Sequence, residues 1–550
     1  MRNQIIFLIF FSVSLFLKAQ VKQWEKPKIH TLIKTEQWEV NDLIFYTKNK
    51  VESPFRKDVY AIVTSEEGTQ KIPVFYNGKN EWVFRYSSNS IGNKTYKLEG
   101  EIKELTRKKG EILVIENTKK TRHGAVGLSE KDPQHFYYED GKHYFNLAFE
   151  CDWLFALDYG NNELKKTDQL LTTIAENGFN QVVMNVYAYD VLWPKDEKLA
   201  DNPEIDYGSR EDIFPFLGSN SAPDYRSLNV EFFKHFDKVI SSMHDKEIVS
   251  HLMIYVWNKL VNWPEFNSEA DDMYYDYVIK RYQAFPNVIW DVSKEALLYG
   301  NVNKNYISDR ISRTRELDGF DRMVSVHDYG YCRNNPDEVD FISSQNWKHT
   351  LYKHMIDAKK EFPAKPIFNI EHGGYEEATY KVFPGVYTNA ESCLRRNYMC
   401  LFAGAYTTYY WQGASWNVVV HNPFEQEEDV YKPHFEYFKH MRNLFEKFPF
   451  EKFKPNSKNN LTGYNLTNDE DGVVMMFVPK ENFTIMYEGF FHKNYDTSET
   501  TIQWFNTLTG EFSEVQKINK TIKNNFWPWQ PWRGEADTIL ILQNLKPKNK

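Results

Sequence analysis

The stretch DDMYYDYVIKRYQAFPNVIWDVSKE, Asp271 to Glu295, contains one helical pattern followed by one strand pattern. The strand run is apolar through Val288, Ile289, Trp290 and Val292, which is typical of a strand buried on both faces. It ends on a carboxylate, Glu295. A buried strand that ends on an acid indicates that the acid reaches a site beyond the end of the strand.

The same alternation of helix and strand surrounds this stretch on both sides. Eight strand–helix units follow one another in about 330 residues, from KHYFNLAFECDW to HFEYFKHMRNLFEKF. Alternation of this kind predicts a parallel sheet, and eight units favour a (β/α)₈ TIM barrel over an open, doubly wound sheet. A long insertion, residues 193–227, is expected to wall one side of the barrel mouth.

Short alternating strands with turn residues flank the predicted barrel. The NGKN step, residues 77–80, stands between two aromatic runs and indicates a hairpin. We therefore expect a multidomain protein with a β-sandwich on each side of the barrel. The predicted division is a signal peptide at 1–20, an N-terminal β-sandwich at 21–119, the barrel at 120–450 and a C-terminal β-sandwich at 451–550.

The N-terminus and the composition limit where the protein acts and on what. Arg2 precedes an apolar core and then Ala19-Gln20, the pattern of a cleaved signal peptide without a lipid-anchor cysteine, so we expect export to the periplasm or the extracellular space and no membrane attachment after cleavage. The net charge of −9 gives no basic field for nucleic acid. Four cysteines are too few for disulfide bonds to be the main stabilisation of this fold. Cys393 and Cys400 lie too far apart along a predicted helix to form a disulfide with each other.

The active site of such a barrel lies at the carboxyl ends of its strands. Glu295 ends the fourth strand run and Glu371 ends the seventh, so the two carboxylates are expected to face each other across the mouth. Glycoside hydrolysis needs this arrangement, with one acid to protonate the leaving oxygen and one carboxylate opposite it. Glu295 and Glu371 are the predicted catalytic residues.

Polar and aromatic side chains at the other strand ends suit a carbohydrate, because ring faces stack on sugar C–H faces. No metal or organic cofactor is implied, and the expected partner is a polysaccharide or an oligosaccharide. The expected substrate contacts are Asp152, Asn185, Tyr187, Trp257, Lys294, His327, Gln345, Trp347, His349, His372, Tyr375, Trp411 and Trp416.

These motifs resemble the retaining glycoside hydrolases of clan A, especially the apiosidase-like barrels that follow a small N-terminal β domain of the DUF5060 type. NVIWDVSKE is similar to the strand-four motif of that clan, which implies that Glu295 is the acid/base. KPIFNIEHGGYE is similar to the strand-seven motif, which implies that Glu371 is the nucleophile. VDFISSQNWKH resembles the strand-six segment and implies substrate contacts at Gln345 and His349. WFNTLTGEF and ADTILIL resemble a C-terminal β-sandwich of the collagen-binding type.

Lys294 stands where the clan usually has the asparagine that holds the sugar 2-hydroxyl. A cation at this position favours the ionised form of Glu295, or binds a carboxylate or sulfate on the sugar, or points to solvent.

Two other classes of function therefore stay open. A uronate-active lyase or dehydratase would use His327, His372 or a tyrosine as base, with Lys294 neutralising the developing charge. A non-catalytic carbohydrate-binding protein would use Trp527, Trp529 and Trp532 as an aromatic platform, although these indoles also suit a cover over the C-terminal sheet.

Overall fold

A computed structural model gives the architecture of the chain. Outside the described ranges lie the predicted signal peptide, Tyr375, Trp411 and Trp416 of the predicted site, and the indoles of Trp527 and Trp529. The structure describes residues 32–191, 206–300, 302–372, 390–410, 434–456, 463–482, 495–517 and 530–548.

The N-terminal region is a sandwich of two sheets, as predicted. The five-stranded sheet has the order β1-β8-β7-β3-β4, and the three-stranded sheet has the order β2-β6-β5. Alternate strand residues such as Ala61, Leu98 and Trp82 fill a shared core between the sheets. Residues 77–80 form the predicted turn between β5 and β6. The strands are β1 (Leu32–Glu36), β2 (Asn41–Tyr46), β3 (Val59–Ser65), β4 (Gly68–Pro73), β5 (Phe75–Tyr76), β6 (Glu81–Tyr86), β7 (Gly92–Gly100) and β8 (Lys109–Ile115).

The middle of the chain forms a nearly closed barrel of eight parallel strands, which confirms the predicted fold. The hydrogen-bonded order is β17-β16-β15-β12-β11-β20-β19-β18, and the two end strands β17 and β18 lie side by side. The strands are β11 (Leu147–Glu150), β12 (Gln181–Asn185), β15 (Val249–Val256), β16 (Val288–Lys294), β17 (Val324–His327), β18 (Ile342–Gln345), β19 (Ile367–Glu371) and β20 (Tyr406–Tyr409). A hairpin of β9 (Val126–Leu128) and β10 (Phe136–Tyr138) precedes β11.

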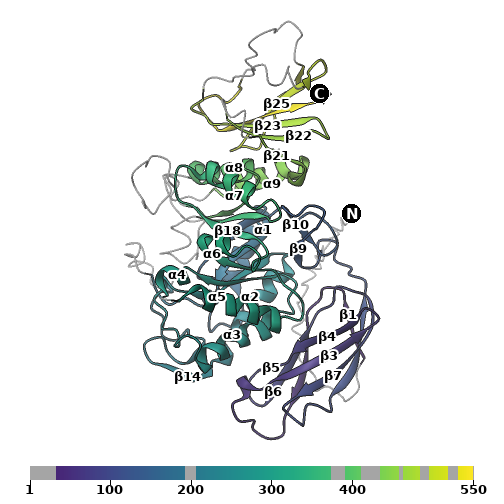
Figure 1. Cartoon of the computed structure of the whole chain (residues 1–550), viewed down its shortest axis with the longest axis vertical. Coiled ribbons are helices and arrows are strands. Elements are labelled where there is room, and N and C mark those ends of the chain that lie inside the picture. Colours follow the sequence, from purple (N-terminus) through teal and green to yellow (C-terminus); the bar gives the residue numbers. More distant parts are fainter. Residues whose placement is uncertain are drawn as a thin grey trace, which may run out of the picture.

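Helices surround the barrel, and their apolar faces pack on the strands (Figure 1). The connection between β17 and β18 contains the six-residue helix α6 (Tyr329–Asn334). The predicted insertion contains a hairpin of β13 (Phe216–Gly218) and β14 (Pro223–Leu228) in its described part. The helices are α1 (Lys165–Glu176), α2 (Val230–Asp245), α3 (Glu269–Tyr282), α4 (Ala296–Tyr299), α5 (Lys304–Leu317), α6 (Tyr329–Asn334), α7 (Leu351–Glu361), α8 (Ala390–Phe402) and α9 (Glu436–Lys447). No helix in the described ranges has both the length and the apolar character that crossing a membrane requires.

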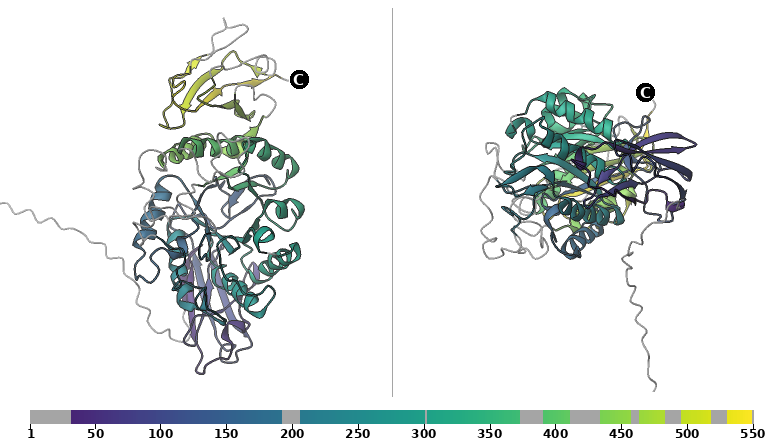
Figure 2. Two further views of the ribbon diagram at one scale, coloured as in Figure 1. Left: turned by 90° about the vertical axis from the view of Figure 1, so that its left-hand side faces the viewer. Right: turned by 90° about the horizontal axis from the view of Figure 1, so that it is seen from below.

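The C-terminal region is rich in β-structure. One face of its sheet packs on the barrel, where the rings of Phe477 and Tyr398 of α8 stack 5.4 Å apart, and Figure 2 shows α8 and α9 between this sheet and the strands of the barrel. Trp532 packs on the opposite face of the sheet, so it covers apolar surface, as the structural reading of this indole predicts. The six-stranded sheet has the order β21 (Lys454–Pro455), β22 (Tyr464–Asn468), β23 (Val473–Val478), β27 (Thr538–Gln543), β25 (Thr501–Asn506) and β26 (Gln516–Lys517), and β24 (Tyr495–Asp496) pairs with β28 (Lys546–Pro547).

A buried arginine joins the N-terminal sandwich to the barrel. Arg85 of β6 lies 2.7 Å from Asp42 of its own sandwich and 3.0 Å from Asp237 of α2. Its guanidinium also donates to the carbonyl of Arg281 in α3. Because all of these bonds form with one nearly buried side chain, the sandwich is held firmly against α2 and α3. All four cysteines of the chain are buried and free, as expected.

Candidate active site

Lys294, the last residue of β16, reaches into the barrel and lies between two glutamates. Its ammonium nitrogen is 2.7 Å from Glu150 Oε1 of β11 and 3.0 Å from Glu371 Oε2 of β19. Lys294 is 1% exposed, so it does not point to solvent. Burial would lower its pKa, but Asp152, Glu150 and Glu371 outweigh burial and hold the pKa of Lys294 well above its ordinary value.

Glu371 is held as a carboxylate. Its Oε2 forms an ion pair with the ammonium group of Lys294 and lies 3.3 Å from His327 Nε2 of β17. Burial would raise the pKa of Glu371, but the Lys294 cation and the contact with His327 are stronger and keep that pKa below its usual range. Glu371 therefore has the charge that a nucleophile needs.

Glu295 has the opposite environment. Burial and then the charge of Glu371 raise the pKa of Glu295, while Lys294 has a smaller, lowering effect. Its backbone lies in the left-handed region, φ 60° and ψ 28°, which is strained for a side chain other than glycine. Its Oε2 is buried and has no hydrogen-bond partner among the residues that the structure describes. A carboxyl of raised pKa with one unpaired oxygen is suited to keep a proton and to donate it.

Gln345, at the end of β18, connects the two glutamates. Its amide nitrogen donates to Glu371 Oε1 at 2.9 Å and lies 3.4 Å from Glu295 Oε1. The sum of these two distances places the two Oε1 atoms at most about 6.3 Å apart. The two predicted catalytic residues thus meet at one point of the mouth.

The floor beside this group is a second buried ion pair. Lys259 Nζ lies 2.9 Å from Asp152 Oδ2, and Asn185 of β12 donates to the carbonyl and the carboxylate of Asp152. Burial opposes the charge of Asp152, but Lys259 and then Lys294 lower its pKa below the ordinary value. Asp152 and Asn185 were expected to contact the substrate. In the structure Asn185 donates to Asp152, and Asp152 forms an ion pair with Lys259.

The expected aromatic contacts lie in two places, the rim of the barrel mouth and the hydrophobic core. Trp257 and Trp347 are half-buried; the indole nitrogen of Trp257 is buried without a hydrogen-bond partner, and the ring of Trp347 meets Tyr410 edge-on at 5.3 Å. Tyr187 is 1% exposed and lies among the rings of Phe155, Phe214 and Phe232. The structure therefore places Tyr187 in the core and the two tryptophans at the mouth.

The three expected histidines also lie in different surroundings. His327 contacts Glu371. His372 is fully buried, and its Nε2 is 3.4 Å from Thr407 Oγ1 of β20; burial and then Arg396 lower the pKa of His372 to about 3. His349 is exposed and makes no hydrogen bond or ion pair within the described ranges. Only His327 is brought to the two glutamates.

Two residues of the charged group were not among the expected contacts. Glu150 was recognisable as the acid that ends the first strand run, the signal that identified Glu295. Lys259 follows β15 in a loop and has no such signal. No group of three or more His, Cys, Asp or Glu side chains in the described ranges is arranged to hold a metal ion.

Comparison with protein families gives two matches. Residues 130–452 match the model of the apiosidase-like catalytic domain, and residues 34–101 match a domain of unknown function, DUF5060. Neither match extends beyond residue 452, so the resemblance of the C-terminal region to a collagen-binding-type sandwich stays a prediction. No curated protein matches the chain.

Solved structures of low sequence identity share the fold. A Bacteroides vulgatus protein described as a candidate glycoside hydrolase superposes with a TM-score of 0.70 at 15% identity, over 93% of this chain and 99% of its own. A glycoside hydrolase of family 5 from the same organism superposes with a TM-score of 0.51 at 15% identity, over 76% of this chain and 93% of its own.

Proposed function

Because the chain belongs to the family of apiosidase-like catalytic domains, we propose that it is a glycoside hydrolase that acts with retention of configuration. Glu371 is the nucleophile and Glu295 the acid/base. The solved structures that share its fold are described as glycoside hydrolases, which supports the proposal.

The observation that carries the mechanism is the contact of Gln345 with both glutamates. It limits the separation of their Oε1 atoms to about 6.3 Å. Inverting enzymes keep their two carboxyl groups ~6.5–9.5 Å apart to leave room for water, whereas retaining enzymes keep them ~5 Å apart. The separation therefore supports direct attack by one carboxylate. It also argues against an inactive barrel, in which the two carboxyls need not converge.

The electrostatics divide the two roles. Glu371, kept ionised by Lys294, attacks the anomeric carbon while protonated Glu295 donates its proton to the leaving oxygen. Glu295 is then a carboxylate that removes a proton from water, and the water oxygen displaces Glu371 from the sugar. Lys294, His327 and Gln345 hold Glu371 in place throughout, and Trp257 and Trp347 are the ring platforms at the mouth. Asp152, Asn185, Tyr187, His349 and His372 are weaker candidates because their surroundings hold them in the floor, in the core or in solvent.

The lyase or dehydratase reading needs Lys294 to face a substrate carboxylate. In the structure the Lys294 ammonium already contacts two glutamates, and His372 faces Thr407 rather than the mouth. These contacts favour hydrolysis over elimination.

The expected substrate is a polysaccharide or an oligosaccharide, which the protein would bind after its own export. The division into a signal peptide at 1–20, a sandwich at 21–119, the barrel at 120–450 and a C-terminal domain at 451–550 is part of the same proposal.

The test is mass spectrometry of the products from a panel of neutral, uronate-containing and sulfated oligosaccharides. We expect fragments whose masses sum to substrate plus one water, and we expect Glu371→Gln and Glu295→Gln to abolish them. Products that lack the added water would support elimination. Activity that survives Glu371→Gln would contradict the assigned nucleophile.

A further inference from the structure

A second cavity lies between the N-terminal sandwich and the barrel, away from the two glutamates. It has a volume of about 260 Å³ and is lined by strands of the sandwich and by the loop of residues 319–322 that leads into β17. The active site lies at the other end of β17, where His327 is five residues, or about 16 Å of strand, beyond Arg322. A ligand in this cavity is therefore bound separately from a substrate at Glu371.

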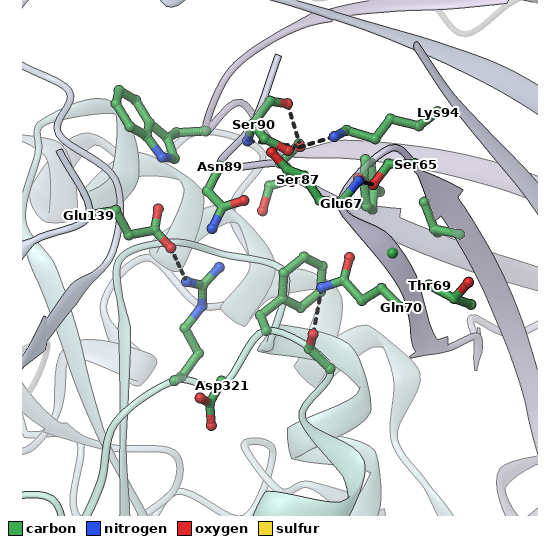
Figure 3. A pocket seen from close by; sticks show the side chains of 18 residues that line it. Ser65, Glu67, Thr69, Gln70, Ser87, Asn89, Ser90, Lys94, Glu139 and Asp321 are labelled. Atoms are coloured by element: carbon green, nitrogen blue, oxygen red, sulfur yellow. Dashed lines mark hydrogen bonds and ion pairs between the residues drawn. The ribbon is translucent and has the colours of Figure 1, made fainter. Parts of the chain in front are cut away.

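A buried lysine faces the cavity. Along β7 the inward positions are Lys94, Tyr96 and Leu98, so Lys94 occupies a position where an apolar residue would fill the core. Lys94 is 4% exposed, and its ammonium group donates to Ser90 Oγ, as Figure 3 shows. Within the described ranges, Lys94 forms no ion pair with a carboxylate. A buried ammonium with one hydroxyl partner retains unused hydrogen-bonding capacity, which is costly unless a ligand or water uses it.

A further donor lies beside the same space. The side-chain amide of Asn89, a residue that lines the cavity, is exposed, and within the described ranges the only hydrogen bond of Asn89 is the one that its backbone carbonyl accepts from the Gln37 side chain. Lys94 and Asn89 thus keep donor capacity that a ligand can use, whereas the serine hydroxyls at positions 87 and 88 donate to carbonyl oxygens. A fitting ligand is one rich in acceptor oxygens.

The other charges around the cavity limit the ligand to a single negative charge. Arg322 is paired with Glu139 at 3.5 Å across the junction (Figure 3), so it brings no free charge. Glu67 and Asp321 are exposed at the rim and repel a polyanion. Lys94 remains as the one unneutralised cation among the residues that line the cavity.

We propose that this cavity is an accessory binding site for one sugar residue that carries a single carboxylate or sulfate group. The acidic group pairs with Lys94, the side-chain amide of Asn89 donates to a ring or hydroxyl oxygen, and the rings of Tyr86 and Phe320 border the same space. The volume suits one monosaccharide unit rather than a longer chain. The site goes beyond the proposed hydrolysis, and its binding requires no turnover.

The test is calorimetric titration with methyl β-glucuronide, methyl β-glucoside and methyl β-glucoside 6-sulfate, using Glu371→Gln protein so that no substrate is consumed. We expect the two acidic probes to bind at least about tenfold more tightly than the neutral one. Lys94→Met is expected to remove that preference. Lys97→Met, the same change at an exposed position of the same strand, is the control and is expected to leave it unchanged.

A second variant keeps the test decisive where Lys94→Met fails to fold. Asn89→Ala removes only an exposed side-chain amide at the cavity, and it is expected to weaken all three probes about equally. Equal binding of the neutral and acidic probes, absence of binding, or an unchanged preference in Lys94→Met would overturn the proposal. None of these results bears on hydrolysis at Glu371, which the product masses test separately.

Discussion

One buried cation sets the chemistry of the site. Lys294 forms ion pairs with Glu150 and Glu371, whereas it acts on Glu295 only by a longer-range electrostatic interaction. A cation stabilises the ionised form of the carboxylate it contacts, and the effect falls with distance. Glu371 therefore stays charged while Glu295, buried beside that charge, keeps its proton more readily. Lys294 therefore gives the two glutamates different protonation preferences.

Lys294→Met is expected to lower kcat by about 10²–10³-fold, because Glu371 then loses the cation that keeps it ionised in a buried place. The acid limb of the rate profile is expected to move to higher pH, since the pKa of Glu371 rises. Steady-state rates across the pH range measure both effects. Lys348→Met, at an exposed lysine near the mouth, is the control. Wild-type rates in Lys294→Met would contradict the role given to this cation.

The wild-type enzyme is expected to show a bell-shaped dependence of kcat/KM on pH. Glu371 must be ionised and its pKa is lowered, so activity persists as pH falls below the ordinary glutamate range. Glu295 must be protonated and its pKa is raised, so activity declines only as pH rises through a value above that range. Rates of the wild type across the pH range measure both limbs. An alkaline limb at or below the ordinary glutamate range would contradict the raised pKa of Glu295.

The sequence predicted the positions of both glutamates but not the direction of Lys294. Simple alternation along β16 places Lys294 on the same face as Trp290, whose indole donates to Asp318 at the end of α5, outside the barrel. The register of β16 with β17 shifts between Asp291 and Lys294. Such an irregularity reverses the alternation, so Lys294 points inward. Because the shift breaks the two-residue alternation of the strand, the sequence pattern alone could not predict that Lys294 points into the barrel.

The four-residue helix α4 is the element that fixes Glu295. It begins directly after Glu295, and Gly300 ends it against Trp257. A Cβ at Gly300 would lie 2.6 Å from Trp257 Cδ2 and 2.9 Å from the carbonyl of Ala296. The close approach of Gly300 thus couples the position of Glu295 to the position of Trp257.

Gly300→Ala is expected to lower kcat/KM about tenfold, because either Trp257 or α4 must move and misplace Glu295. Kinetics on the substrate identified from the panel measure this loss. Gly127→Ala is the control, because a Cβ there meets nothing within 4 Å, and it is expected to be neutral. Equal activity of the two variants would show that the contact with Trp257 does not position the site.

Elements with a clear period were the predictable ones. The eight strands were recognised because buried parallel strands are continuous apolar runs, and α2 and α5 because they are long. The six-residue α6 is too short to show a period, and β13 and β14, paired across an irregular register, have mixed burial that hides their alternation. The elements that were missed lie in connections, where local sequence specifies structure least.

The two flanking β regions contact the barrel at different places. Figure 1 shows the C-terminal sheet above the barrel and the N-terminal sandwich beside its lower half. Arg85 fastens the N-terminal sandwich to α2 and α3, and the C-terminal sheet packs its apolar face on α8. The described residues of the candidate site all belong to the barrel strands and the loops that follow them, and none belongs to the flanking β regions. Their presence was predictable from strand spacing, but their contacts were not, because they depend on single side chains such as Arg85.

Arg85→Met is expected to lower the free energy of unfolding by about 3 kcal/mol, because Asp42 and Asp237 lose a buried cation. Arg56→Met removes an exposed ion pair with Glu269 across the same junction, and it is expected to cost at most about 1 kcal/mol. Urea unfolding of both variants beside the wild type measures the difference. Equal costs would mean that the buried network does not hold the junction.

The central claim is that Glu371 attacks the sugar directly, and the anomeric configuration of the product tests it most directly. Proton NMR during the first minutes of hydrolysis, before the released sugar mutarotates, identifies the anomer formed first. We expect it to have the configuration of the substrate, because two displacements at one carbon restore it. A first product of the opposite configuration would show a single displacement by water and contradict the assignment of Glu371.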